Sequence, residues 1–431
     1  MSDRRINIRV PVLARVEGEG ALELNISNQQ ITRLQLKIFE PPRLFEKLLE
    51  GRHFSEVPDI VARICGICPV AYQMSAIHAF ETLFHIDPGP WVRQMRRLFY
   101  CGEWLESHAL HIHLLAAPDF FGYDSAPAMA KDYPDEIRRG LALQHIGNQI
   151  LAFLGGRSVH PVGAKIGGFH HAPKQSDADA LLQKLYDTLP LAEELITWVA
   201  SFPLPDNEQA FTYVALRHPH DYPLNEGNIL SSAGHNIAIA DYAQHFIEHQ
   251  EAHSTALYSL LDNQAYLVGP LARLNLNFDR LPNQVQTVLH STGIRFPSQN
   301  MFHSVLARAG EIYFALQESI HQLEAYQAPK TPNVPVQPKA GMAYGCSEAP
   351  RGMLWHCYQV NEQGIIQQAR IVPPTSQNQA RMEQDLRQSI AELGLDKPEQ
   401  QIRLHAEQVI RNYDPCISCA THFLDLRIHR Q

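Results

Sequence analysis

The sequence has few cysteines and no long apolar runs. It contains seven cysteines in 431 residues, an odd and sparse number that argues against a disulfide framework and for reduced thiols. No stretch approaches the ~18 consecutive apolar residues of a membrane-spanning helix, and the N-terminus lacks the apolar core of a signal peptide. We therefore expect a cytoplasmic protein without a membrane span.

Positive charge is also scarce. The chain has 36 Lys and Arg against 45 Asp and Glu, which gives a net charge of −9, and it has no long basic run. Nucleic-acid binding is not expected, because it requires a basic surface. With 45% hydrophobic residues the composition is that of an ordinary folded protein, and the length predicts roughly three structural units.

Four of the cysteines form two Cys-x-x-Cys pairs near opposite ends of the chain, Cys65/Cys68 and Cys416/Cys419. Two such pairs can make a four-thiolate metal site. Structural zinc is one interpretation, but zinc ribbons usually separate their pairs by ~15–20 residues, whereas here most of the chain lies between them. The metal would therefore join the two ends of the protein across its core.

Apolar periodicity predicts a mainly helical chain with β-hairpins near both ends. Alternation predicts a hairpin over 22–38 and another over 354–372, and a short helix is expected near Leu48. Three- and four-residue spacing predicts longer helices over 71–84, 92–115, 178–200, 237–261, 304–326, 380–393 and 398–409.

The expected organisation has five parts. A β-hairpin and short helix (1–60) precede a helical core that includes the first cysteine pair (61–328). A proline-rich connector (329–340) leads to a C-terminal segment with the second pair (341–422) and a tail (423–431).

Five elements, in order, resemble those of the large (alpha) subunit of nickel–iron hydrogenases. They are Arg-Val-Glu-Gly at 15–18, Arg-x-Cys-Gly-x-Cys at 63–68, Glu-Ala-Pro-Arg-Gly at 348–352, Val-Pro-Pro-Thr at 372–375 and Asp-Pro-Cys-x-x-Cys-x-x-His at 414–422. The residues in these elements resemble those of the cytoplasmic, bidirectional, NAD(P)-linked, sulfhydrogenase-like group. The resemblance covers the whole chain and implies that family's fold, α+β and predominantly helical, with a long central helix bundle.

The resemblance implies a hydrogenase that reversibly converts H₂ to protons and electrons. Its four thiolates would hold nickel, with Cys65 and Cys416 terminal, while Cys68 and Cys419 also bridge to an iron that carries CO and cyanide. Thiolates suit this role because they are soft, electron-rich ligands that stabilise variable oxidation states, which zinc does not have.

Several other residues match functional positions of the family. Arg351 would place its guanidinium over the metal pair, with Asp119 and Asp414 fixing it. Glu17 would take a proton from a terminal cysteine. Thr375 would donate to a cyanide. Glu46 and His422 would hold Mg²⁺ or Fe²⁺ behind the active site.

The resemblance also implies partners. The family removes a tail such as 423–431 with a maturation endopeptidase once the metal is loaded, so the mature chain is expected to end at His422. We expect no iron–sulfur cluster and no dinucleotide on this chain, which has neither a third cysteine cluster nor a Gly-x-Gly-x-x-Gly after a strand. Electrons would leave through an iron–sulfur small subunit, and flavin and iron–sulfur subunits would connect it to NAD(P).

Two features leave room for other interpretations. Tyr72 stands where many relatives carry a histidine beside the bridging sulfur, and a phenol does not shuttle protons at neutral pH. His108, His111 and His113 lie on one predicted helix, where they either relay protons or pack in the core, packing being favoured.

Alternative functions are a hydrogen-sensing regulatory hydrogenase and the related non-metal quinone-binding module of respiratory NADH dehydrogenase, which lacks the four cysteines.

Overall fold

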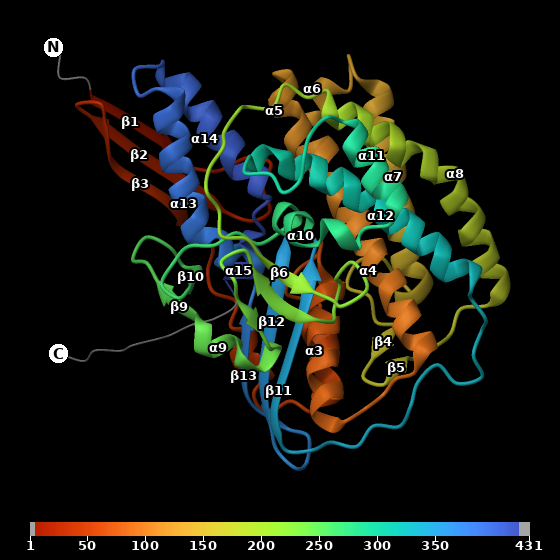
Figure 1. Cartoon of the computed structure of the whole chain (residues 1–431). Coiled ribbons are helices and arrows are strands. Elements are labelled where there is room, and N and C mark those ends of the chain that lie inside the picture. Colours follow the sequence, from red (N-terminus) through yellow and green to blue (C-terminus); the bar gives the residue numbers. More distant parts are fainter. Residues whose placement is uncertain (1–4, 422–431) are drawn as a thin grey trace, which may run out of the picture.

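The computed structural model describes residues 5–421 and confirms the α+β class (Figure 1). Small antiparallel sheets lie beside a bundle of long helices. An N-terminal sheet and the two helices α13 (Pro374–Leu393) and α14 (Glu399–Tyr413) form one side of the molecule, and the long helices form the other. The segments that carry the cysteines lie between the two sides.

The N-terminal sheet is a three-stranded meander. Strands β2 (Gly20–Ser27) and β3 (Gln30–Ile38) confirm the predicted hairpin, and β1 (Arg5–Val10) adds an edge strand. The apolar alternation buries one face of the sheet against α13, where the Leu36 N–H donates to Glu383 at 2.8 Å. The predicted short helix follows as α1 (Phe45–Leu49).

Four long helices make the bundle. They are α4 (Pro90–Leu110), which runs on through a π-helical turn at His111–Ala116, α7 (Pro134–Gly155), α8 (Gln175–Ala200) and α12 (Ser304–Glu324). The predictions for α4, α8 and α12 are confirmed, whereas α7 was not predicted because glycines interrupt its sequence. At Gly147 a Cβ would lie 2.7 Å from the Gly102 carbonyl oxygen, so these glycines allow α4 and α7 to pack closely.

A second meander carries the C-terminal hairpin. Strands β12 (Gly352–Val360) and β13 (Ile366–Val372) confirm that hairpin, and β11 (Gly341–Ala349) pairs with β12 through a turn of two residues, Pro350 and Arg351. Helix α3 (Pro69–Phe84) lies against β11 (Figure 1). A Cβ at Gly345 would come 1.9 Å from the Ser75 carbonyl oxygen, so no larger residue fits at this contact.

The predicted helix over 237–261 is wrong. Strand β8 (Asn236–Ile237) and the single-turn helix α9 (Tyr242–His245) are followed by a hairpin of β9 (Phe246–Gln250) and β10 (Leu257–Leu261). The apolar spacing there fits either period, and the aromatic and β-branched residues favour strands once a partner strand is available. Burial of Phe246 and Leu261 against the β11–β13 side decides for the hairpin.

Shorter elements complete the chain: α2 (Val57–Val61), α5 (Ala117–Phe121), α6 (Ala126–Met129), β4 (Ala164–Lys165), β5 (Gly168–Phe169), β6 (Val214–Arg217), β7 (Asn228–Ser231), α10 (Pro270–Asn277), α11 (Asn283–Ser291) and α15 (Ile417–Ala420). Within residues 5–421, none of the helices combines the length and apolar character needed to span a bilayer.

Candidate metal centre

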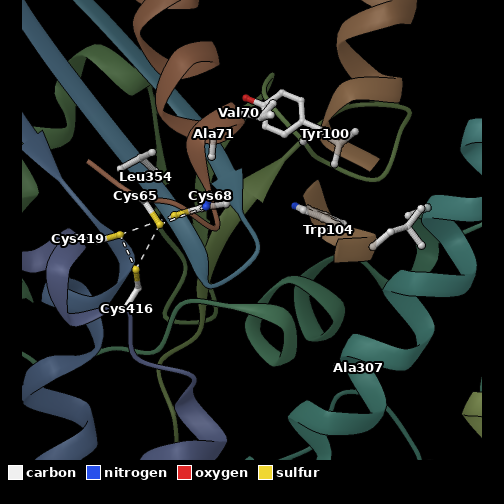
Figure 2. Packing of buried hydrophobic residues seen from close by; sticks show 14 of the residues in the cluster. Cys65, Cys68, Val70, Ala71, Tyr100, Trp104, Ala307, Leu354, Cys416 and Cys419 are labelled. Carbon is white, nitrogen blue, oxygen red and sulfur yellow. Dashed lines mark hydrogen bonds between the residues drawn. The ribbon is translucent and has the colours of Figure 1, made fainter. Parts of the chain in front are cut away.

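Four cysteine thiols from the two ends of the chain meet in the interior (Figure 2). The Sγ–Sγ distances are 3.5 Å between Cys65 and Cys416, 3.7 Å between Cys68 and Cys419, and 2.7 Å between Cys416 and Cys419. All four residues are 1–3% exposed. Among residues 5–421 they are the only group of three or more His, Cys, Asp or Glu side chains arranged to hold a metal ion.

The first pair lies in the loop between α2 and α3. Cys68 immediately precedes Pro69, the first residue of α3. The backbone amides of Ile67 and Cys68 donate to the Cys65 sulfur at 3.3 and 3.2 Å, so the loop wraps around this thiol. Gly66 is exposed between the two buried cysteines, which places the centre just beneath the surface.

The second pair is held by backbone pairing with the N-terminal segment. Glu17 forms a parallel bridge with Cys416, and its carbonyl accepts from the Ile417 N–H at 3.0 Å. The Glu17 carboxylate accepts from the Ser418 N–H at 3.1 Å, and the Thr375 hydroxyl accepts from the Cys416 N–H at 2.9 Å. Glu17 and Thr375 therefore both lie against the loop of the second pair.

Arg351 reaches this loop from the β11–β12 turn. Its guanidinium is 2% exposed and donates to the Asp414 carbonyl at 2.9 Å, to the Asp414 carboxylate at 3.1 Å and to the Ser107 hydroxyl at 3.3 Å. Burial opposes the charge, but Asp414 and the neighbouring thiolates hold the pKa of Arg351 well above its usual value. Arg351 therefore remains a cation beside the cysteines.

The predicted pairing of Asp119 with Arg351 is not observed. Asp119 instead accepts from the Arg411 guanidinium at 2.6 and 2.8 Å and also binds Arg15. Ser107 is the residue on the α4 side that contacts Arg351. Asp119 lies on α5, beyond the π-helical turn that ends α4, and from there it reaches the two arginines that precede Glu17 and Asp414 in the chain.

The thiols differ in their electrostatic surroundings. Burial raises the pKa of Cys68, Cys416 and Cys419. Burial also acts against ionisation of Cys65, but hydrogen bonds with the other three thiols and the charge of Arg351 hold the pKa of Cys65 well below its usual value. Four buried thiols beside one guanidinium need further positive charge to ionise together, and a bound metal ion supplies it.

The donor set fits a soft metal ion. Metal–sulfur bonds of about 2.3 Å place the sulfurs of one site roughly 3–4 Å apart, and the two distances that join the pairs, 3.5 and 3.7 Å, agree with this spacing. Thiolates favour zinc, nickel and iron over hard cations, so the geometry alone leaves the metal open.

The second predicted metal site is described only in part. Glu46 lies on α1, half-buried, and accepts from the Ile371 N–H at 2.7 Å. His422 and the tail 423–431 lie outside the described residues. The Arg43 N–H donates to the carbonyl of Thr421 at 2.7 Å, so the segment just before α1 is bonded to the last described residue.

Three buried histidines on α4 and its π-helical extension are neutral. Burial lowers the pKa of His108 to about 4 and those of His111 and His113 to about 3. One ring nitrogen of each is hydrogen-bonded, at 2.8 to 2.9 Å, to Glu311 or to a backbone carbonyl. These observations favour the packed interpretation over a proton relay.

Tyr72 lies in the core beside the cysteines. Its ring is 5.6 Å from that of His356, and burial together with the thiolate charges raises the pKa of Tyr72 well above its usual value. Tyr72 therefore stays protonated, as the sequence led us to expect.

Polar residues of α4 near the centre escaped sequence analysis. Glu103 accepts from the Val70 and Ala71 amides at 2.6 and 3.1 Å, so it fixes the start of α3 next to Cys68. Burial raises the pKa of Glu106 to about 7, and Ser107 contacts Arg351. Their spacing of three and four residues was the available signal, because it places these polar groups on one face of the helix.

Comparison with known proteins identifies the class. A family model described as nickel-dependent hydrogenase matches residues 43–136 and 241–422. The sulfhydrogenase 1 alpha subunit of Pyrococcus furiosus is 32% identical over 99% of this chain and 100% of its own length. The beta subunit of the NAD-reducing hydrogenase of Cupriavidus necator is 28% identical over 96% of this chain and 94% of its own length.

Solved structures of hydrogenases resemble this fold over nearly the whole chain. The NAD⁺-reducing [NiFe]-hydrogenase in its H₂-reduced state superposes with a TM-score of 0.85 at 25% identity, covering 98% of this chain and 100% of that one. The Ni-Fe-Se hydrogenase of Desulfovibrio vulgaris superposes at 0.80 over 97% of this chain and all of its own, at 22% identity, and supports the fold alone.

The chain belongs to the nickel-dependent hydrogenase family. It is of the catalytic, alpha-subunit type, an oxidoreductase of the nickel–iron class, and its relatives are subunits of multi-subunit hydrogenases. The four-cysteine cluster suits the nickel that the family name implies. The hydrogenase prediction is confirmed, and membership in this family speaks against both the structural zinc protein and the quinone-binding module.

Proposed function

We propose that this chain catalyses reversible cleavage of H₂ into protons and electrons at a nickel–iron pair. The observation that carries the proposal is the meeting of four buried thiols near a buried arginine that stays cationic. Cys65 and Cys416 would bind nickel terminally, and Cys68 and Cys419 would bridge to an iron with CO and cyanide ligands. When bound, this pair supplies the redox chemistry that separates H₂ into protons and electrons.

Three residues around the cluster, Arg351, Glu17 and Thr375, have separate roles in this proposal. Arg351 would hold a positive charge over the centre, and its two hydrogen bonds to Asp414 support this role. Glu17 would take a proton from the terminal sulfur of Cys416 and pass it outward, and its bonds to the loop of Cys416 support this role. The Thr375 hydroxyl accepts from the Cys416 amide, so its own proton is available for a cyanide.

Asp119 acts indirectly in this proposal. It binds Arg15, two residues before Glu17, and Arg411, three residues before Asp414. The Asp119 carboxylate therefore joins the segment that carries Glu17 to the segment that carries Asp414. We propose a positioning role for Asp119 in place of direct contact with Arg351.

The hard-metal site and the tail extend the proposal. Glu46 would bind Mg²⁺ or Fe²⁺ with His422, and hydrogen bonding between Arg43 and Thr421 supports the approach of α1 to the C-terminal end. A maturation endopeptidase would remove 423–431 after metal loading. We also keep the division into 1–60, 61–328, 329–340 and 341–422 as a proposal.

Electrons need a partner to carry them away. We propose an iron–sulfur small subunit docked near the exposed Gly66, with flavin and iron–sulfur subunits leading to NAD(P) in the cytoplasm. Support comes from relatives named as alpha or beta subunits and from the NAD-reducing activity in the names of two of them.

Infrared spectroscopy of the complex isolated with its native partners tests the proposal. Iron-bound CO and cyanide absorb in a window that is free of protein bands. Bands in that window, together with nickel in the sample and H₂-dependent reduction of NAD(P), are the expected result. A mature, metal-loaded complex without these bands would rule out the nickel–iron pair, and bands with very slow turnover would indicate a hydrogen sensor.

A further inference from the structure

The turn that carries Arg351 is held by a second buried arginine. Arg273 lies on α10 with its side chain fully buried. It donates to the Ala349 carbonyl at 2.7 Å and to the Pro350 carbonyl at 3.0 Å, the two residues directly before Arg351. These carbonyls belong to a tight turn inside the protein, where an acceptor without a donor costs free energy.

Two carboxylates in turn fix the Arg273 guanidinium. Glu311 on α12 accepts from Nε and Nη2, both at 2.8 Å, and Glu348 on β11 accepts from Nη1 at 3.1 Å. With the two carbonyls, these contacts use all five N–H donors that a guanidinium has. The Arg273 side chain also lies 4.4 Å from the centre of the Trp104 ring, whose indole donates to the Glu348 carbonyl at 3.0 Å.

Packing against the start of α10 restricts the turn further. At Gly269 a Cβ would lie 3.0 Å from the Arg351 carbonyl oxygen, and at Gly352 one would lie 2.6 Å from Val268. Both glycines have φ values, +119° and +132°, that other residues rarely adopt. The backbone on either side of Arg351 therefore lies directly against α10 and the residues before it.

We infer that Arg273 is a positioning residue for Arg351. Two of its contacts fix the backbone from which the Arg351 side chain extends to Asp414, and the other three hold the guanidinium itself in place. Only a guanidinium can make these five directed contacts together. The functional part of this inference rests on the proposed role of Arg351 beside the nickel–iron pair. Lysine at 273 would keep the charge but offer three donors from a single point, so it cannot bind both carboxylates and both carbonyls.

The test compares Arg273→Lys and Arg351→Lys in the complete enzyme with its partner subunits. Arg96→Lys is the matched control, because Arg96 is equally buried and makes a bidentate pair with Glu81, at 2.6 Å for both contacts, away from the turn. We expect Arg273→Lys to retain nickel, to lower H₂ turnover roughly 10- to 100-fold, and to shift the cyanide infrared bands. The Arg96→Lys enzyme should keep the wild-type band positions even if its melting temperature falls.

A double variant separates positioning from general damage. If Arg273 acts through Arg351, adding Arg273→Lys to Arg351→Lys should lower turnover by less than about threefold more, because the two effects share one pathway. Fully multiplicative effects, or wild-type bands in Arg273→Lys despite slow turnover, would overturn the inference. If Arg273→Lys does not fold, Glu348→Gln leaves one acceptor oxygen where two now bind Arg273 and the Leu216 N–H, and it should shift the bands in the same direction.

Crystallography gives a readout that does not require the metals. In Arg273→Lys apoprotein we expect the contact between Arg351 Nη2 and Asp414 to be lost, and an unchanged contact would reject the inference. Absence of CO and cyanide bands in the wild-type complex would instead count against the proposed function, so the two failures are distinguishable.

Discussion

The guanidinium of Arg351 is bound to Asp414, two residues before Cys416, through both the backbone carbonyl and the carboxylate of that residue. An arginine at the tip of one hairpin is thereby joined to the loop that supplies half of the thiol cluster. Because Asp414 ends α14 in a left-handed conformation, φ 56° and ψ 55°, its two acceptors face the same guanidinium. The charge of Arg351 is thus held by the same loop that supplies two of the four sulfurs.

Replacing Arg351 by lysine should leave the metals in place and lower H₂ turnover by about 100-fold or more, because an ammonium cannot reproduce the planar fork. Asp414→Asn should have a smaller effect in the same direction, since the backbone acceptor remains. Metal analysis and H₂ uptake measure both effects. Arg403→Lys, at a half-exposed helix pair, is the control, and full activity in Arg351→Lys would contradict the role of Arg351.

Cys65→Ser should abolish nickel retention, because an alkoxide is not formed near neutral pH and a hydroxyl is a poor ligand for a soft metal. Cys101→Ser provides the matched control, since Cys101 is also buried but lies outside the four-thiol group. Nickel content per chain after purification is the measurement. Equal nickel in both variants would show that Cys65 is not a ligand.

Thr375→Val should destabilise the loop of the second pair by about 1–3 kcal/mol, since it leaves the buried Cys416 amide without its acceptor. Thr375→Ser keeps the hydroxyl and should remain close to wild type. Thermal unfolding of the metal-free chains compares the two. If valine and serine have the same effect, the hydrogen bond is not what holds Cys416.

The neutral histidines predict acid lability with a definite sign. Burial lowers the pKa of His113 to about 3 against an ordinary value near 6.5, so below pH 6.5 the unfolded chain takes up a proton that the folded chain refuses. This contribution to stability is complete above pH 6.5 and is lost as the pH falls toward 3. Below pH 6.5, His113→Gln should therefore reduce the slope of the free energy of unfolding against pH by about 1.4 kcal/mol per pH unit.

Urea unfolding between pH 5 and 7 measures that slope. The substitution also removes the stacking of His113 on Trp198, at 5.4 Å between ring centres, but this loss is the same at every pH and shifts the curve without changing its slope. Parallel curves for wild type and variant would mean that His113 titrates normally in the folded protein.

Local patterns predicted most of the secondary structure. Helices α3, α8 and α12 and the hairpin β12–β13 follow from apolar periodicity within one segment. The errors lie where tertiary contacts outweigh that pattern. The segment 237–261 has strands because a partner strand and a buried surface were available, and α7 tolerates its glycines because they allow a close approach to α4.

The site residues that lie within short sequence motifs could be predicted from the sequence. The two cysteine pairs are recognisable from their spacing alone, whereas Arg351 was predicted from the resemblance to the family. Two carboxylates were assigned to Arg351. Asp414 contacts it, whereas Asp119 binds Arg15 and Arg411. Arg273 carries no motif at all, and its importance emerges only from the five acceptors that surround it.

The sequence by itself determined which ligands this protein can offer, because a Cys-x-x-Cys loop brings its two sulfurs together within four residues. The tertiary structure alone decided that Ser107 contacts Arg351, that Asp119 binds Arg15 and Arg411 instead of Arg351, and that Arg273 supports the turn. Those contacts join residues far apart in the chain. Their formation depends on how helices and sheets pack, which no local spacing encodes.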